Sequence, residues 1–291
     1  MKALNLFSVK KLATGLVFAA LCFPFVITSC YFGGDDPLEP YEAGEFNKPK
    51  FESASALYNI TSGNSGLQSI ELTASGIYVV IPKHSGTKSF DDHIFDSHTK
   101  YVSTRSSDDG IIYGHYTKKG NGVFVLAGFG TIAVKGGEDN AVSLDITLEN
   151  GSKMEVGAQK ADQYESSLKT NALCRTWDLG KVVLHKSNGD ITYDSLLEYN
   201  NSERQGYDPD DLPIQIIFTK SGTYIVIYAG GELAVSTWAW ENEETGRARY
   251  SWDYSNIYSG DIIDIAFENK QALITEYWSK YSLTYYLSEA K

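Results

Sequence analysis

The sequence predicts an all-β protein made of two related antiparallel units. The stretch IIFTKSGTYIVI, which begins at Ile216, nearly repeats IELTASGIYVVI, which begins at Ile70, and seven of the twelve paired positions are identical. The chain contains 20 Tyr and only two Met, and its β-branched and aromatic runs are typical of strands. The repeat and the composition together indicate duplicated β structure with few helices.

Each copy of the repeated stretch has the pattern of a β-hairpin. Apolar residues alternate on both sides of a Ser-Gly reversal. Gly76 and Gly222 are the residues most able to adopt a positive φ in so short a turn. Thr73 and Thr219 hold the same place in the two copies, so we expect them to lie in equivalent environments.

A second, shorter echo occurs further along each copy. DITLEN begins at Asp145 and DIAFEN begins at Asp264, an offset of 119 residues against 146 for the first echo. The difference predicts about 27 extra residues in the first copy, between the matched segments. Whether the two units form separate barrels or one shared sandwich stays open at this level.

Residues 1–29 have the pattern of a secretory leader. Three lysines precede an apolar run that is short and interrupted for a membrane span. The leader ends in Ile-Thr-Ser followed by Cys30, which resembles the bacterial lipobox, in which the cysteine thiol is acylated. We therefore expect Cys30 to carry a lipid such as palmitate; an ordinary secretory signal is the alternative.

Residues 30–52 are expected to form a flexible tether, because they are acidic, contain proline and lack apolar periodicity. Acidic residues soon after Cys30 are similar to surface-export signals of Bacteroidetes lipoproteins. Removing the leader changes the net charge from −12 to −15. Such a charge disfavours nucleic acid and anionic headgroups as partners, so the lipid is the expected membrane contact.

The first β unit is expected at 53–158. Its extra length falls in a polar segment, 84–110, whose possible metal donors are Asp91, Asp92, His93, Asp96 and His98. The spacing of these donors matches no known metal motif, and a solvated loop explains them equally. We therefore expect no metal and no other cofactor.

A polar connector is expected at 159–172, with one or two helical turns over 161–168, followed by the second unit at 173–291. Trp177 should anchor the first strand of this unit and find a partner for its indole N–H. Cys174 has no cysteine partner left and is interpreted as a small buried apolar residue. The acidic stretch 200–213 lacks a calcium-loop register and is expected to be an exposed loop.

The second unit resembles a known family. Leu173-x-x-x-Trp177, the Phe-Thr-x-x-Gly-Thr-Tyr hairpin at 218–224 and Thr237-Trp238 are similar to the lipocalin-like lipoproteins of the Bacteroidetes group. The resemblance covers 173–287 and weakens in the first copy, where Tyr116 stands near the place of Trp238. It implies a small antiparallel barrel or half-barrel behind a lipid anchor, and it implies no established activity.

Five aromatic residues form the candidate ligand site. On two adjacent expected strands, alternation places Trp238, Trp240, Tyr250, Trp252 and Tyr254 on one surface. Such a surface can hold an apolar molecule or stack a glycan. It can equally be packed core, because cross-strand aromatic pairs stabilise sheets by themselves.

The chain contains no phosphate loop, zinc-protease helix, paired-cysteine motif or Gly-x-Ser-x-Gly elbow, so we expect it not to be an enzyme. The sequence favours a non-catalytic binding module for a small apolar ligand or glycan, anchored by lipid at the outer membrane and possibly exposed on the cell surface. The alternative is a structural or adhesive surface component without a small ligand. A metal-dependent hydrolase using His93 and His98 is the weakest hypothesis.

Overall fold

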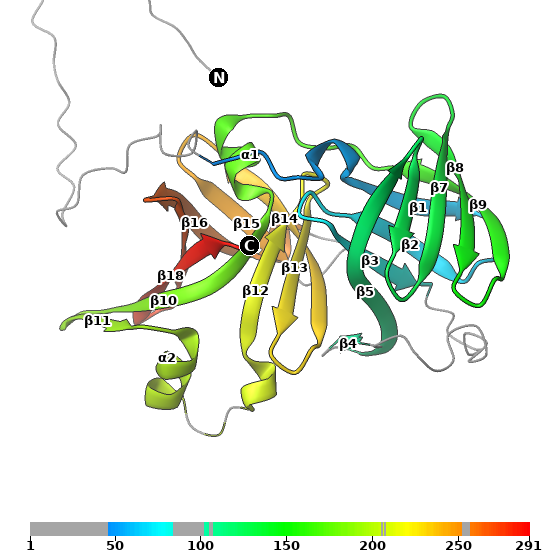
Figure 1. The fold of residues 1–291 in the computed structure, drawn as a ribbon. Helices are drawn as coiled ribbons and strands as arrows, with labels where there is room; N and C mark the ends of the chain where they lie inside the picture. The colour runs from blue at the N-terminus through cyan, green and yellow to red at the C-terminus, as the bar shows by residue number, and fades with distance from the viewer. Residues whose placement is uncertain (1–45, 84–101, 105–106, 205, 207, 252–256) are drawn as a thin grey trace, which may run out of the picture. The chain divides into compact units, whose positions relative to one another are not determined.

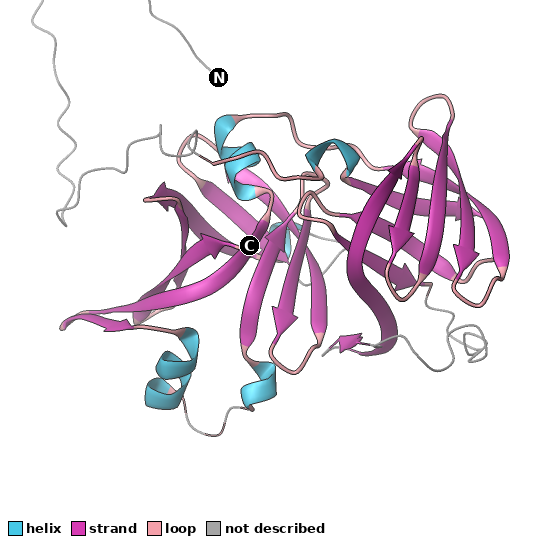
Figure 2. Cartoon of the chain, in the orientation of Figure 1, coloured by secondary structure: helices cyan, strands magenta, loops and turns pink. Residues whose placement is uncertain are grey.

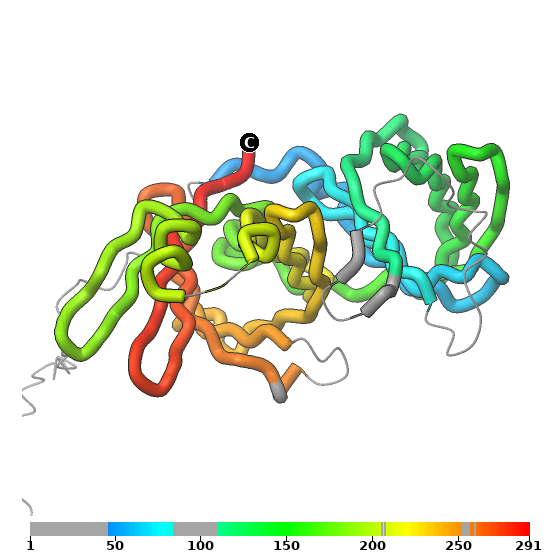
Figure 3. Tube along the Cα trace, turned by 90° about the horizontal axis from the view of Figure 1, so that it is seen from below, coloured from blue at the N-terminus to red at the C-terminus, as the bar shows by residue number. Residues whose placement is uncertain are grey.

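Two eight-stranded antiparallel barrels, each closed on itself, make up the described part of the chain (Figures 1 and 2). The computed structural model describes residues 46–83, 102–104, 107–204, 206, 208–251 and 257–291. The two related units expected from the sequence are therefore confirmed as two barrels rather than one sandwich. Both rings of strands can be followed in Figure 3.

The first barrel is a meander in which each strand pairs with the next, and the last strand pairs with the first. After a short 3₁₀ turn η2 (Glu52–Ala54), its elements are β1 (Ala56–Ser62), β2 (Leu67–Leu72), β3 (Ile77–Pro82), β4 (Val102–Thr104), β5 (Ser107–Gly120), β6 (Val123–Leu126), β7 (Gly130–Gly136), β8 (Ala141–Leu148) and β9 (Lys153–Lys160). Closure comes from the pairing of β1 with β9, and β4 is an extra strand beside β5. Ring closure leaves the eight main strands without a free edge.

The second barrel repeats this order. Its elements are β10 (Thr176–Lys186), β11 (Gly189–Tyr193), α2 (Leu196–Glu203), η3 (Pro209–Asp211), β12 (Pro213–Phe218), β13 (Thr223–Tyr228), β14 (Leu233–Asn242), β15 (Arg247–Ser251), η4 (Ile257–Ser259), β16 (Asp261–Glu268), β17 (Gln271–Tyr277) and β18 (Tyr281–Glu289). The long strand β10 pairs with both β12 and β18, which closes the ring. The short strand β11 extends the sheet beyond β10.

The repeated hairpins are equivalent in detail. Gly76 and Gly222 have φ values of 88° and 81° in the β2–β3 and β12–β13 turns. Thr73 and Thr219 are both buried, and each Oγ1 accepts the backbone N–H four residues later, at 3.0 Å in both copies. The carbonyl of each threonine also accepts a side-chain donor, from Tyr116 Oη at 2.7 Å and from Trp238 Nε1 at 2.9 Å. The shared environment expected for the two threonines is confirmed.

The outer faces of the two repeated hairpins share one apolar cluster. It contains Ile77, Val79 and Ile111 together with Ile217, Ile225, Ile227, Leu233 and Val235. Beside it, the buried carboxylate of Glu71 accepts a hydrogen bond from Ser221 Oγ at 2.8 Å. Burial raises the pKa of this carboxyl, while hydroxyl donors from Thr223, Thr219 and Ser221 oppose the shift. Both faces of each hairpin are therefore covered by protein, which explains their nearly continuous apolar sequence.

The second echo in the sequence does not mark equivalent strands. Asp145–Leu148 ends β8, whereas Asp264–Glu268 ends β16. Counting from the equivalent hairpins, β8 corresponds to β17, and β16 corresponds to β7. The estimate of 27 extra residues was therefore wrong: 24 residues link β3 to β5 and 4 link β13 to β14, a difference of 20. The echo reflects two strands that both run into a Glu-Asn turn.

The connector helix lies later than expected. Residues 161–167 are not helical, and the helix is α1 (Leu168–Leu173). The backbone N–H of Tyr164 donates to the Lys220 carbonyl at 2.8 Å, so it does not form the bond to the carbonyl four residues earlier that a helix over 161–168 would require. Ser167 then caps α1 by accepting the N–H of Thr170.

The stretch 200–213 is not only an exposed loop. Its first four residues complete α2, and Asn200 is buried. Ser195 caps α2 through the Glu198 N–H, and the Glu198 carboxylate accepts the Asp194 N–H, an arrangement close to a capping box. Within the described ranges, no helix has the length and apolar character needed to cross a membrane.

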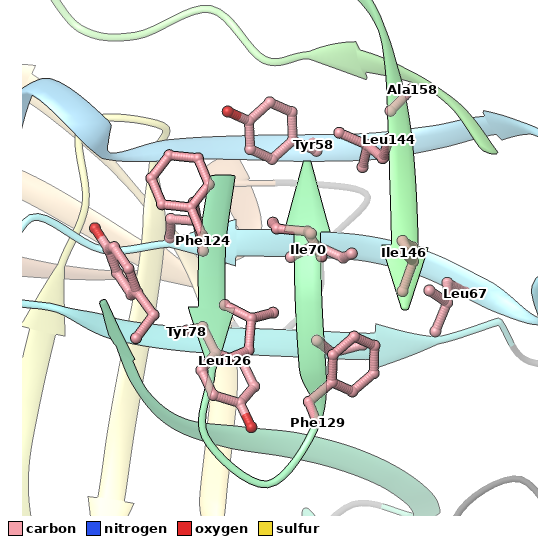
Figure 4. Packing of buried hydrophobic residues seen from close by; sticks show 14 of the residues in the cluster. Tyr58, Leu67, Ile70, Tyr78, Phe124, Leu126, Phe129, Leu144, Ile146 and Ala158 are labelled. Atoms are coloured by element: carbon pink, nitrogen blue, oxygen red, sulfur yellow. The ribbon is translucent and has the colours of Figure 1, made fainter. Parts of the chain in front are cut away.

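The first barrel is filled by its own side chains (Figure 4). Inward residues alternate along its strands and are almost fully buried; they include Tyr58, Ile70, Tyr78, Phe124, Leu126, Phe129, Leu144 and Ile146. The Tyr78 hydroxyl donates to the Ala127 carbonyl at 2.7 Å. The polar end of the Tyr78 ring is therefore satisfied within the protein.

We expect Thr73→Val to lower the free energy of unfolding by about 1–3 kcal/mol, because the buried Ile77 N–H loses its hydroxyl acceptor. Urea denaturation followed by circular dichroism measures the change. Thr131→Val on β7, where the side chain is only half-buried, is the control and should change stability by no more than about 0.5 kcal/mol. Equal stability of the two variants would contradict the role assigned to Thr73.

Candidate ligand-binding site

One end of the second barrel is plugged by aromatic rings. Trp177, Trp238 and Phe267 lie there, and the ring of Phe46 packs edge-on against Trp177 at 5.5 Å. The indole N–H of Trp177 donates to the Leu173 carbonyl at 2.9 Å, which supplies the partner expected from the sequence. This end contains the turns β12–β13 and β16–β17 and is covered by α1.

Cys174 belongs to the same plug. It is free of disulfides, 3% exposed and packed in the apolar cluster. Burial raises the pKa of its thiol strongly. A protonated, enclosed thiol is a poor nucleophile, in keeping with the structural role expected for this residue.

The opposite half of the second barrel contains a cavity of about 490 Å³ that is partly open to solvent. Its walls are mainly apolar and aromatic, and α2 supplies part of the lining. The lining residues include Leu179, Leu184, Tyr199, Ile216, Tyr224, Val226, Tyr228, Tyr250, Ile274, Glu276, Trp278, Tyr281, Leu283 and Tyr285. The volume lies in the range of about 300–1,000 Å³ that is typical of small-molecule pockets.

Two carboxylates line this cavity, Glu203 and Glu276, and Glu276 comes from the barrel wall. On β17, Ala272, Ile274 and Glu276 alternate toward the barrel interior, so the strand pattern directs Glu276 inward. Its Oε1 accepts from the Tyr250 hydroxyl at 3.0 Å, and its Oε2 accepts from the Tyr285 hydroxyl at 3.1 Å. Protein surrounds the carboxyl on most sides, and its remaining exposed surface faces the cavity.

Burial dominates the electrostatics of this group. Loss of solvation raises the pKa of Glu276, the two tyrosine hydroxyls oppose that rise, and the nearby negative charge of Asp261 adds to it. The pKa values of Tyr250 and Tyr285 are also raised, first by burial and then by the charge of Glu276. Both phenols therefore stay protonated at neutral pH and serve as hydrogen-bond donors.

The mouth of the cavity carries charges that are mostly paired. Lys186 Nζ lies 3.0 Å from Glu203 Oε2, and the Tyr193 hydroxyl donates to Glu203 Oε1 at 2.6 Å. Arg204, at the end of α2, points its guanidinium toward the Asn200 side chain at 3.5 Å. Glu203 and Arg204 are exposed lining residues, whereas Glu276 is half-buried.

The structure separates the aromatic residues expected to form the site. Trp238 lies in the plugged end, 2% exposed, with its ring 5.4 Å from Phe218. Trp240 packs edge-on against Trp238, and its indole N–H donates to Thr170 Oγ1 at 2.9 Å. Neither tryptophan lines the cavity.

Tyr250 is the expected site residue that lines the cavity. It pairs with Trp238 across β14 and β15, as the sequence indicated, but its hydroxyl reaches Glu276 in the other half of the barrel. Trp252, Tyr254 and the acylation candidate Cys30 lie outside the described residues. The possible metal donors at 91–98 lie outside them as well.

Sequence reasoning missed Glu276, Tyr285 and the contribution of α2. The signal for Glu276 was its position two residues after Ile274, on the apolar face of an alternating strand. In the described ranges, no cluster of three or more His, Cys, Asp or Glu residues could hold a metal ion. No family model matches the chain, and no curated protein is significantly similar to it.

Replacing the cavity carboxylate should change how stability depends on pH. Because the pKa of Glu276 is raised above its ordinary value of 4.5 in the folded state, its contribution to stability is fully present below that value and is lost as pH rises toward the folded pKa. Gln at position 276 does not titrate. We therefore expect the stability of Glu276→Gln, relative to the unsubstituted protein, to increase from about pH 4 to about pH 8.

Urea denaturation of both proteins across this pH range measures the difference. Other titrating groups are common to both proteins and cancel in the subtraction. A difference that stays constant, or that falls with rising pH, would show that Glu276 is not held in a desolvated site.

Proposed function

We propose that this chain is a lipid-anchored envelope lipoprotein whose second barrel binds a small apolar molecule without catalysis. The observation that carries the proposal is the cavity of about 490 Å³ within a barrel whose other end is plugged. A concave space lined by apolar and aromatic side chains, with some convergent polar groups, is the usual form of a small-molecule site.

The lining favours an apolar ligand over a glycan. Side chains such as Leu184, Val226 and Ile274 offer no hydrogen bonds, and the polar groups gather around Glu276 and at the mouth. A sugar ring buried against those apolar walls would leave several hydroxyls unpaired, at a cost of about 1–3 kcal/mol for each. A molecule with an apolar body avoids this cost.

The cellular location of the protein is part of the same proposal. The leader at 1–29 and Cys30 support acylation. The acidic residues between Cys30 and Phe46, where the chain packs against the second barrel, support a tethered position at the outer membrane. A flexible tether would place the binding barrel near the lipid surface without inserting it.

Filling the cavity should abolish ligand binding. Val226 faces the cavity, so Val226→Phe should occupy part of its volume and weaken binding of the neutral probe N-phenylnaphthylamine by about tenfold or more, measured by fluorescence titration. Ile225→Val on the outer face of the same strand is the control and should leave probe affinity unchanged.

The matched substitution in the first barrel separates cavity filling from general damage. Val80 holds the same repeat position as Val226 but lies in a filled core. We expect Val80→Phe to lower the unfolding free energy by about 1–3 kcal/mol through overpacking, and Val226→Phe to cost less. No probe binding to the unsubstituted protein, or equal binding to Val226→Phe, would contradict the proposed site.

The anchor has its own test. Cys30→Ala should move the protein from the detergent phase to the aqueous phase in a Triton X-114 separation, and it should abolish labelling by radioactive palmitate in cells. Cys174→Ala is the control, because that thiol is buried in the barrel plug, and it should leave both readouts unchanged. Continued labelling of Cys30→Ala would show that acylation occurs elsewhere.

A further inference from the structure

The Glu276 carboxylate lines the cavity and has no cationic partner within the part of the chain that the structure describes. Among the described residues, no lysine or arginine forms an ion pair with it, and its two hydrogen bonds come from neutral phenols. Burial of an ionised carboxylate is unfavourable unless a counter-charge or several donors compensate. When Glu276 is ionised, its negative charge is therefore not compensated by a positively charged side chain of the described residues.

The hydrogen-bond geometry leaves room for a ligand donor. An ionised carboxylate has about four lone-pair positions, and Tyr250 and Tyr285 each occupy one of them, on different oxygens. Both hydroxyls use their single O–H group to donate a hydrogen bond to Glu276. A ligand that approaches from the cavity meets acceptor positions on the carboxylate, which an ammonium group can fill with its three N–H donors.

The surrounding rings suit a cation as well. Tyr224 packs against Tyr250 with ring centroids 5.3 Å apart, and Tyr228 lines the cavity on the same strand as Tyr224. The faces of tyrosine rings attract ammonium groups, more strongly when water is excluded. Apolar surfaces of Val226 and Ile274 lie beside them and can cover the body of the ligand.

The remaining charges near the cavity also favour a cation. Asp261 adds negative charge close to Glu276. Lys186 is paired with Glu203, and the exposed Arg204, which also lines the cavity, acts in the opposite direction. The chain carries a net charge of −12, which raises the local concentration of cations and lowers that of anions.

We propose that the cavity of the second barrel takes a primary amine with an apolar or aromatic body, whose ammonium group contacts the Glu276 carboxylate between Tyr250 and Tyr285. This inference rests on the proposed binding function and specifies its ligand class. The ammonium supplies the missing counter-charge, and the body of the ligand fills the apolar half of the cavity.

Three molecules that share a phenyl ring and a short linker but differ in charge test the inference. They are phenethylamine, phenethyl alcohol and phenylacetate, titrated into the folded protein by isothermal calorimetry at neutral pH. We expect the amine to bind about tenfold or more tighter than the alcohol, as one charge-assisted contact would give, and the acid to bind weakest.

The matched variant is Glu276→Gln, which keeps the shape of the side chain and removes its charge. It should bring the amine and alcohol affinities to within about threefold of each other. Glu71→Gln is the control: Glu71 is also buried and bonded by hydroxyls, but it lies outside the cavity, so the amine preference should persist. Circular dichroism establishes that both variants are folded.

The outcomes distinguish the two proposals. If the alcohol or the acid binds as tightly as the amine, or if Glu276→Gln retains the amine preference, the inference about the ligand class fails while the binding function stands. If none of the three molecules binds, and N-phenylnaphthylamine does not bind either, the binding function itself is contradicted.

Discussion

Closure of each meander by pairing its first strand with its last is the constraint on which the rest of the structure depends. The β1–β9 and β10–β18 ladders leave no free edge on the main strands of either ring and fix eight strands around an interior of limited size. Once the ring is closed, every second residue of each strand must point into that interior. The volumes and charges of those residues then decide whether the barrel becomes a solid core or a container.

The two barrels share one strand order and differ in the side chains that occupy their interiors. Around the repeated hairpins they agree closely: Tyr116 and Trp238 bond to the carbonyls of Thr73 and Thr219, and their backbone N–H groups bond to Gly76 and Gly222. Away from the hairpins they diverge. The first interior is filled by aromatic and aliphatic side chains, whereas the second has an acid and tyrosine hydroxyls facing a cavity. The first barrel therefore has a packed core, whereas the second leaves space between its side chains.

Local sequence patterns predicted the features of the fold that depend on neighbouring residues alone. The hairpins, their glycines and the Trp177 anchor follow from turn preference, alternation and the need to satisfy an indole N–H. The second echo misled because two strands that end in the same turn look alike wherever they lie in the ring. Trp238 and Tyr250 were paired as expected, yet Tyr250 lines the cavity and Trp238 does not. Depth along a barrel axis depends on strand tilt and closure, which a single sequence does not display. Glu276 was overlooked for the same reason. Its environment depends on hydrogen bonds from Tyr250 and Tyr285, which lie on other strands of the closed barrel.

Under the binding function that we propose, the apolar side chains of the cavity would provide affinity for many small molecules. Glu276 and its two phenols would then select among them by charge. The most direct measurement is a crystal structure of the protein grown with phenethylamine. The account predicts ligand density inside the second barrel, with the amine nitrogen within about 3.2 Å of a Glu276 carboxylate oxygen. Ligand density outside the barrel, or inside it with the nitrogen turned away from Glu276 toward the mouth, would contradict it.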